Sequence, residues 1–279
     1  MPFPRPIVVL SQCLELAPCR WDGERIPFGF LRKLEPYVEL RPVCPEVEIG
    51  LGVPRDPIRI VQVGPGEKDR KFLQPSTGRD LTRAMRRFAG EFLGGLGEAD
   101  GFILKSRSPS CGIRDVKMYG GAEDGPPLGK GAGLFAGEVL ARFPGLAVED
   151  EARLAHPPVR ERFLTRLFAL AAFRAVREKP SAAGLARFQE ANRLLLMARG
   201  RREAEALGEI AANRGGRPLP EAMEAYETRL RAALARPARR ASVAGILRRH
   251  AGAPWLAGQT FFAPFPAGLA EAGEEPDSP

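Results

Sequence analysis

The sequence predicts an α/β domain with a mainly parallel sheet, in a three-layer arrangement, followed by an all-α helical domain. Up to about residue 150, short strand-like runs alternate with helical segments, which is typical of a parallel α/β sheet. Beyond residue 151 no strand candidate stands out, and Gly or Pro residues separate successive helical segments. We therefore expect an α/β domain over residues 1–150, a basic helical domain over 151–266 and a disordered tail over 267–279.

The expected strands of the first domain are short and cover residues 7–10, 37–43, 58–63, 101–105 and 146–149. The expected helices cover residues 28–34, 80–96 and 134–143. In the second of these helices, Asp80 is positioned to cap the free N–H groups of the first turn. Four apolar residues then recur at helical spacing and predict one buried stripe: Leu81, Met85, Phe88 and Phe92.

Within the helical domain, the pair Pro157-Pro158 precedes the first expected helix, which has a helical face running through residues 163–174. Further helices are expected over residues 182–198, 202–213, 220–235 and 241–250. The apolar run at 194–197 is interpreted as core.

Composition narrows the classes of protein that the chain could represent. No apolar run approaches the roughly 20 residues that a membrane span needs, and the first residues lack the apolar stretch of a signal peptide. We therefore expect a cytoplasmic protein, in which metal binding or catalysis explains the four cysteines better than disulfides do. The two histidines are His156 and His250, so acid–base chemistry in the first half would use carboxylates, lysine or hydroxyls.

The net charge of +8 is concentrated in the second half of the chain. Residues 1–150 contain 21 Lys and Arg against 20 Asp and Glu, whereas residues 151–279 contain 21 against 14. This pattern fits either a general arginine bias of a heat-adapted protein or a surface that binds phosphate or nucleic acid.

Three cysteines occupy equivalent positions relative to the predicted strands. Cys13, Cys44 and Cys111 each follow a strand, and the loops at the carboxyl ends of parallel strands converge on one crevice. Three thiolates without a histidine would suit a four-iron cluster with one open iron, or a cysteine-rich zinc site. Buried apolar cysteines of an ordinary core are the alternative.

Four sequence blocks around these cysteines are similar to motifs of one known family. They are Ser-Gln-Cys-Leu at 11–14 with Cys-Arg-Trp-Asp-Gly at 19–23, Cys-Pro-Glu at 44–46 with Gly-Leu-Gly-Val-Pro-Arg at 50–55, Gly-Arg-Asp-Leu-Thr at 78–82, and Leu-Lys-Ser-Arg-Ser-Pro-Ser-Cys-Gly at 104–112. In this order, across residues 7–150, the blocks resemble the thiouracil desulfidase family.

The resemblance implies a [4Fe–4S] cluster held by Cys13, Cys44 and Cys111. It implies that the open iron takes the sulfur of a thiolated uracil or its nucleotide, and that water replaces this sulfur to give sulfide. The family's catalytic residues map onto Glu46 and Ser108, and the resemblance implies that Cys19 is not a ligand.

The residues themselves are compatible with these roles and with simpler ones. Glu46 lies two residues from Cys44, where its carboxylate could activate water or move a proton, or could be a solvated charge. Ser108 could relay a proton or form a turn, and Ser110 could exchange roles with it. Lys105 could hold a phosphate or a substrate carbonyl, or could extend its amine to solvent from the sheet end.

The second half resembles the uncharacterised YbgA-like helical domain through residues 154–163, 188–198 and 207–208. Where that family carries histidines, this chain has Gln189 and Asn192. The domain could bring a nucleotide or RNA to the cluster, or could serve docking or oligomerisation. The arginines expected to contact phosphate in the first case are Arg199, Arg201, Arg202, Arg239, Arg240, Arg248 and Arg249.

The leading hypothesis is therefore an iron–sulfur desulfidase. One alternative is a nucleic-acid-associated protein whose metal is structural. The other is a redox or sulfur-carrier protein, in which Cys19 would close the cluster.

Overall fold

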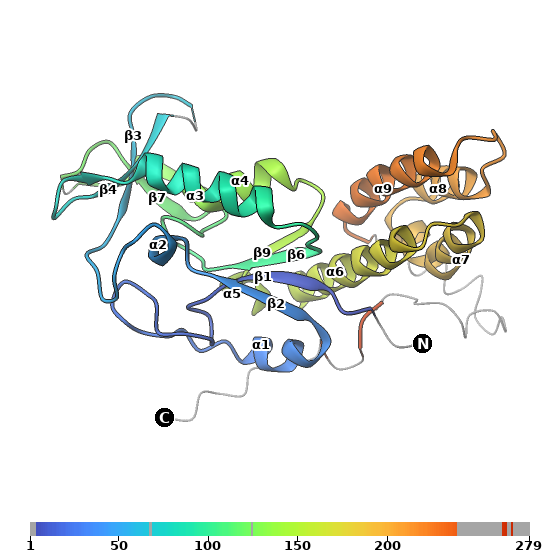
Figure 1. Ribbon diagram of the computed structural model, residues 1–279, viewed down its shortest axis with the longest axis horizontal. Helices are drawn as coiled ribbons and strands as arrows, with labels where there is room; N and C mark the ends of the chain where they lie inside the picture. Colours follow the sequence, from blue (N-terminus) through green and yellow to red (C-terminus); the bar gives the residue numbers. More distant parts are fainter. Residues whose placement is uncertain (1–3, 67–68, 124, 239–263, 267–268, 270–279) are drawn as a thin grey trace. The chain divides into compact units, whose positions relative to one another are not determined.

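The computed structural model describes residues 4–66, 69–123, 125–238, 264–266 and 269 (Figure 1). They form two compact units. One contains residues 7–144 and 148–160, and the other contains 161–238 together with 4–6 and 145–147. Between residues 145 and 161 the chain passes from one unit to the other more than once. The domain boundary predicted at residue 150 lies in this stretch and stays a prediction.

The first unit is built on a four-stranded sheet in the order β2-β1-β6-β9, with bounds β1 (Ile7–Ser11), β2 (Glu39–Val43), β6 (Gly101–Leu104) and β9 (Ala147–Asp150). Strand β1 pairs in parallel with both β2 and β6, and all five of its residues are buried. The edge strand β2 contains Pro42, which an edge tolerates because one side of the strand needs no ladder hydrogen bonds. The predicted α/β architecture is confirmed.

A second, five-stranded sheet was not predicted. Its order is β5-β4-β3-β7-β8, with bounds β3 (Arg59–Gln62), β4 (Arg70–Gln74), β5 (Arg79–Asp80), β7 (Val116–Tyr119) and β8 (Gly129–Gly131). The strand expected at 58–63 is β3 of this sheet, where it runs antiparallel to β4 and parallel to β7. The prediction that it would join the parallel sheet was wrong.

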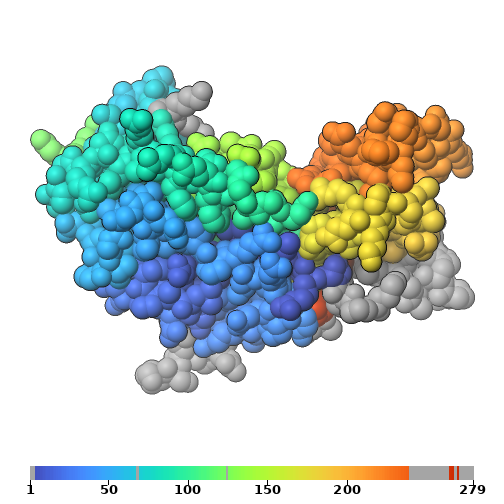
Figure 2. Space-filling model, in the orientation of Figure 1, coloured from blue at the N-terminus to red at the C-terminus, as the bar shows by residue number. Residues whose placement is uncertain are grey.

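Six helical segments complete the first unit: α1 (Gly29–Leu34), the 3₁₀ turn η1 (Glu35–Tyr37), α2 (Pro45–Glu48), α3 (Thr82–Gly95), α4 (Leu134–Arg142) and α5 (Glu151–Leu154). Helices α3 and α4 lie on one side of the four-stranded sheet and α1 on the other (Figure 1). Helix α3 also contacts α2, and their residues adjoin on the surface in Figure 2.

Helix α3 begins two residues later than expected. Asp80 belongs to β5, but its carboxylate still accepts a hydrogen bond from the Thr82 N–H at 3.0 Å. The buried stripe runs through Met85, Ala89 and Leu93. Phe88 and Phe92, predicted to belong to that stripe, are half-buried and pack with their rings against Phe135 of α4, at centroid distances of 6.1 and 5.9 Å.

The second unit is helical, as predicted, and contains most of α6 (Pro157–Glu178) together with α7 (Ala182–Arg199), α8 (Arg201–Ala212) and α9 (Leu219–Ala235). The Ser181 side chain caps α7 by accepting from the Gly184 N–H, and α8 ends at Asn213, whose φ of 44° is left-handed. The helix expected at 241–250 and the tail expected at 267–279 lie outside the described residues, apart from residue 269.

An aromatic cluster forms the core of the helical unit. The rings of Phe173, Phe188 and Tyr226 lie 5.3 to 5.9 Å apart by their centroids. The Tyr226 hydroxyl donates to Gln189 Oε1 at 2.6 Å, and Asn192 Nδ2 donates to the Phe188 carbonyl at 2.9 Å. Gln189 and Asn192 are therefore hydrogen-bonded polar residues of the core. Of the run 194–197 predicted to be core, Leu194, Leu195 and Leu196 are buried and Met197 is half-buried.

None of the helices in the described part of the chain has the length and apolar character that a membrane span requires.

Candidate functional site

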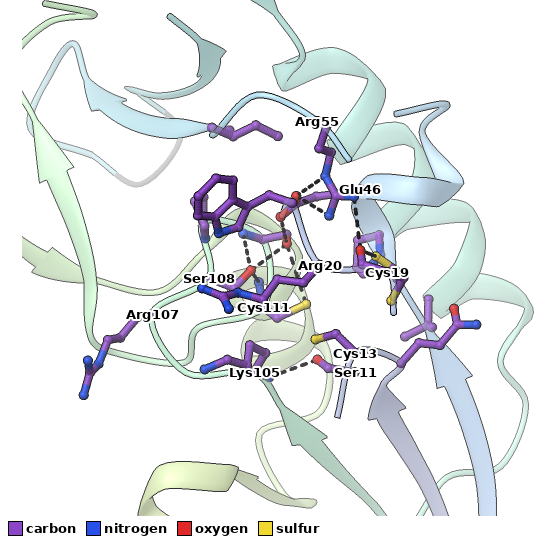
Figure 3. Close-up of a pocket in the computed structure, with 18 of the residues that line it drawn as sticks. Ser11, Cys13, Cys19, Arg20, Glu46, Arg55, Lys105, Arg107, Ser108 and Cys111 are labelled. Carbon is purple, nitrogen blue, oxygen red and sulfur yellow. Dashed lines mark hydrogen bonds and ion pairs between the residues drawn. The ribbon is translucent and has the colours of Figure 1, made fainter. Parts of the chain in front are cut away.

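A cavity of about 370 Å³ opens where β1, β2 and β6 end, and all four cysteines line it (Figure 3). Cys13 lies two residues beyond β1, and Cys44 directly follows β2 and precedes the first residue of α2. Cys111 lies on the loop that leaves β6. Three loops that are distant in sequence thus meet at the carboxyl end of the parallel sheet, which is where ligands bind in such folds.

The four thiols are free and crowded. Cys19, Cys44 and Cys111 are buried, and the Cys44 Sγ lies 3.7 Å from the Cys19 carbonyl oxygen. Burial raises the pKa of Cys111 to about 12, and a hydrogen bond with Cys13 raises the pKa of Cys19 to about 11. A hydrogen bond with Cys19 also raises the pKa of Cys44. These thiols hold their protons in the absence of a cation, so a metal would bind in exchange for protons.

No cluster of three or more His, Cys, Asp or Glu side chains within the described ranges is arranged to hold a metal ion. A four-iron cluster is larger than one ion and holds its thiolates farther apart. The donor set fits such a cluster chemically, because soft sulfur atoms from three strand-end loops face one cavity without a histidine among them.

Glu46 is held by a buried ion pair beside the cysteines. Its carboxylate Oε2 lies 2.8 Å from both Nε and Nη2 of Arg55, with side-chain exposures of 10% for Glu46 and 6% for Arg55. Arg55 Nη1 also donates to the Cys19 and Gly52 carbonyl oxygens, each at 3.1 Å. The two-pronged contact fixes the carboxylate and ties it to the cysteine loop.

Two hydroxyls extend from Glu46 toward Cys111. Ser110 Oγ donates to Glu46 Oε1 at 2.7 Å and lies 2.9 Å from Ser108 Oγ. The Ser108 oxygen accepts from the N–H groups of Ser110 and Cys111, so its own hydrogen is free to point toward Ser110. The resulting chain runs from Ser108 through Ser110 to Glu46.

The start of α4 fixes the loop that carries these serines and Cys111. The Leu134 N–H donates to the Pro109 carbonyl at 3.1 Å, and the Ala136 N–H donates to the Ser110 carbonyl at 3.0 Å. Gly133 allows this close approach, since a Cβ there would lie 2.5 Å from the Ser110 oxygen. The position of Cys111 therefore depends on a helix some twenty residues later in the chain.

Lys105 lines the cavity, but its charge is paired. Its Nζ lies 2.5 Å from Glu151 Oε1 and 3.1 Å from the Ser106 hydroxyl. Glu151 Oε2 also accepts from the Ser106 N–H at 2.7 Å. A phosphate or a substrate carbonyl that binds Lys105, as predicted, would have to compete with Glu151 for the amine.

The sequence did not assign a role to Arg55. Substituting Arg55 tests how much its ion pair with Glu46 contributes to the stability of the fold. Replacing it with methionine leaves the Glu46 carboxylate buried without its ion-pair partner, which costs about 3 to 5 kcal/mol of unfolding free energy. Arg55→Lys keeps the charge but not the fork of donors, so we expect an intermediate loss. Denaturant unfolding of both variants measures these losses.

The matched control is Arg25→Met, which removes an exposed guanidinium in the same part of the chain. Its effect should stay within about 0.5 kcal/mol. A loss in Arg55→Met no larger than that of the control would contradict the structural role of the ion pair.

Comparisons with known proteins identify the first half of the chain. A family model described as 2-thiouracil desulfurase matches residues 8–151, which is more than half of the 279 residues. The chain belongs to the 2-thiouracil desulfurase family. A second model, described as a protein of unknown function (DUF1722), matches residues 193–253. Both resemblances indicated by the sequence motifs are confirmed.

Two relatives of this desulfurase family member cover its first half. The uncharacterized protein YbbK of Bacillus subtilis (strain 168) is 30% identical over 153 residues, which are 53% of this chain and 97% of YbbK. A solved structure titled [4Fe-4S]-dependent thiouracil desulfidase TudS is 30% identical, with coverage of 54% of this chain and 93% of that one, and a TM-score of 0.42. Membership of the desulfurase family supports a desulfidase role.

The arginines predicted to contact phosphate have different surroundings. Arg199 is 6% exposed, whereas Arg201 and Arg202 are exposed at the start of α8. The remaining four lie outside the described residues: Arg239, Arg240, Arg248 and Arg249.

Proposed function

We propose that the chain is an iron–sulfur-dependent desulfidase that hydrolyses the carbon–sulfur bond of a thiolated uracil base or nucleotide. The observation that carries the proposal is that one cavity of about 370 Å³ is lined by Cys13, Cys44 and Cys111 together with Glu46 and Ser108. Within the family to which the chain belongs, this combination of soft sulfur ligands with a carboxylate fits removal of sulfur better than electron transfer alone.

Cys13, Cys44 and Cys111 would hold the cluster, and Cys19 would remain a free thiol beside it. A bound [4Fe–4S] cluster with three protein ligands would supply a sulfur-binding Lewis acid at its fourth iron. The cysteines come from three separate loops, so the cluster would also tie together the ends of β1, β2 and β6.

The reaction needs no oxidant or reductant. Water forms a new C–O bond at the thiocarbonyl carbon, the C–S bond breaks, and the products are the oxo-base and hydrogen sulfide. Both protons of the water must leave the new oxygen: a protein group takes up one as the C–O bond forms, and both finally depart with the sulfur as hydrogen sulfide.

Glu46 is the group positioned to take up and return that proton. Ser108 is the half-buried end of the hydroxyl chain, and the buried Ser110 connects it to the Glu46 carboxylate through contacts of 2.9 and 2.7 Å. A proton can pass along this chain without movement of the backbone, because each hydroxyl both donates and accepts. Arg55 acts as a positioning residue that holds the carboxylate toward Ser110.

A redox or sulfur-carrier function is the second candidate, because Cys19 lines the same cavity and contacts Cys44. A fourth cysteine ligand would close the cluster and leave no iron for substrate. The test of the proposed function is sulfide release from thiolated uracil by iron-containing protein, and Cys19→Ala separates the two candidates.

A further inference from the structure

A second hollow adjoins the cavity that the cysteines line, which we call the cysteine cavity. The second hollow has a volume of about 560 Å³, and Ile58, Arg107 and Pro109 line both it and the cysteine cavity. Figure 3 shows the Arg107 side chain directed away from the cysteines, and 83% of this side chain is exposed. A molecule bound at the cysteines could therefore extend into the second hollow.

The charged residues that line this hollow are mostly cations. They are Arg59, Arg107, Lys117 and Lys130, against the carboxylate of Asp115. The first half of the chain as a whole is nearly balanced, with 21 Lys and Arg against 20 Asp and Glu over residues 1–150. The positive charge is therefore a local feature, and we call this hollow the basic groove.

Three of the cations form a row across neighbouring strands. Lys117 of β7 lies directly opposite Lys130 of β8 in the antiparallel register. In the parallel register of β3 with β7, Ile60 is the partner of Met118, so Arg59 and Lys117 occupy the preceding pair of positions. Neighbouring strands lie about 4.8 Å apart, so the row spans about 10 Å.

Lys117 and Lys130 place like charges side by side. Both side chains are exposed, and within the described ranges neither is paired with a carboxylate. Like charges directly opposite each other destabilise a pair of strands. Lysine on an edge strand such as β8 can serve to prevent pairing with another sheet, but Lys117 lies on β7, inside the sheet. A ligand with several negative charges would relieve the repulsion.

The other charged groups of the groove are already held in place. The Arg59 guanidinium lies over the Tyr119 ring, 4.2 Å from its centroid, and its Nη1 donates to the Ala122 carbonyl at 3.2 Å. The Asp115 carboxylate accepts from the Arg107 backbone N–H at 2.9 Å. The carboxylate of the groove thus fixes the loop of Arg107 and is not directed at the two lysines.

We propose that the basic groove binds the phosphodiester chain of a single-stranded RNA whose thiolated uridine enters the cysteine cavity. The identity of the base rests on the proposed function, and the inference adds that the substrate is an oligonucleotide. A row of cations about 10 Å long matches successive phosphates better than a single phosphate ion. The base must be unpaired, because an enzyme cannot reach the reacting atom of a base inside a duplex.

The test uses the full-length, anaerobically purified protein and a uridine hexanucleotide that contains one 2-thiouridine. Lys117→Gln/Lys130→Gln removes two phosphate contacts, and each contact contributes about 0.7 to the slope of log affinity against log salt for a single strand. We expect the slope to fall by about 1.4 and the affinity to fall about 25-fold at about 0.1 M salt. The kcat/KM for the hexanucleotide should fall by a similar factor, whereas the kcat/KM for thiouracil, which has no phosphate, should not change.

The matched control is Lys33→Gln/Lys179→Gln, which removes the same number of charges from exposed lysines outside the groove. It should behave as the wild type does on every substrate. An equal loss in this control would show a general attraction to the basic protein and would overturn the site. An equal loss on 2-thiouridine monophosphate in Lys117→Gln/Lys130→Gln would assign the row to a single phosphate and overturn the oligonucleotide.

Binding of the unmodified uridine hexanucleotide separates this inference from the proposed function. Fluorescence anisotropy measures that binding without any reaction at the cysteine cavity. Sulfide release from thiouracil, with equal hexanucleotide affinity in the wild type and Lys117→Gln/Lys130→Gln, would overturn the groove and leave the desulfidase intact. Weaker binding in the double variant of a protein that releases no sulfide would support the groove and contradict the desulfidase.

Discussion

Replacing Cys111 with alanine is expected to reduce the iron content of anaerobically reconstituted protein to background, and Cys13→Ala and Cys44→Ala should do the same. The loops that carry Cys44 and Cys111 contain no second cysteine. Cys19 shares the loop of Cys13 and lines the same cavity, and we expect that it does not replace Cys13 as a ligand. Iron analysis and the visible absorption of the cluster measure the result.

Cys19→Ala is the control that distinguishes a cluster with an open iron from a cluster closed by a fourth cysteine. Cys19 is as buried as Cys44, at 8% exposure, so the two substitutions remove equally buried thiols. We expect Cys19→Ala to retain iron and sulfide release. Loss of iron in Cys19→Ala to the same extent as in the other three variants would contradict a cluster with an open iron and favour the redox candidate.

Glu46→Gln is expected to lower kcat by about 10² to 10⁴-fold while leaving the iron content unchanged. Glutamine keeps the shape of the side chain and can still accept from the Ser110 hydroxyl, but it cannot take up a proton. The loss should therefore fall on turnover rather than on cluster assembly. Sulfide release at saturating substrate, normalised to iron, measures it.

Glu48→Gln is the matched control for this change, because Glu48 lies on the same short helix with an exposed side chain. It should behave as the wild type does. Full turnover in Glu46→Gln would exclude Glu46 as the proton acceptor. A parallel loss of iron would instead indicate that Glu46 and Arg55 serve mainly to build the cysteine loop.

The parallel sheet could be predicted because its two central strands, β1 and β6, are buried and mostly apolar runs. All four residues of β6 and all five of β1 are buried, so hydrophobicity alone marks them. The second sheet gives no such signal. Strand β8 is Gly-Lys-Gly, and β7 alternates buried with more exposed residues over only four positions. These strands are stabilised by pairing with neighbours that the sequence pattern does not reveal.

The site residues that could be predicted from the sequence are those that lie just beyond the end of a strand. Cys13 and Cys44 lie within two residues of β1 and β2, so the fold itself brings them together. Arg55 could not be assigned a role, because its contact with Glu46 depends on the turn through Gly50, where φ is 85°. Ser110 was considered only as a substitute for Ser108, whereas the structure connects the two in series.

The most direct test of the proposed desulfidase function is sulfide release from thiouracil and thiouridine monophosphate by anaerobically purified protein, with iron counted in the same sample. An iron–sulfur desulfidase should release one sulfide and one oxo-base per substrate without an added reductant, at a rate proportional to the iron content. Sulfide release that persists after the iron has been removed, or iron-loaded protein that releases none from either substrate, would contradict it.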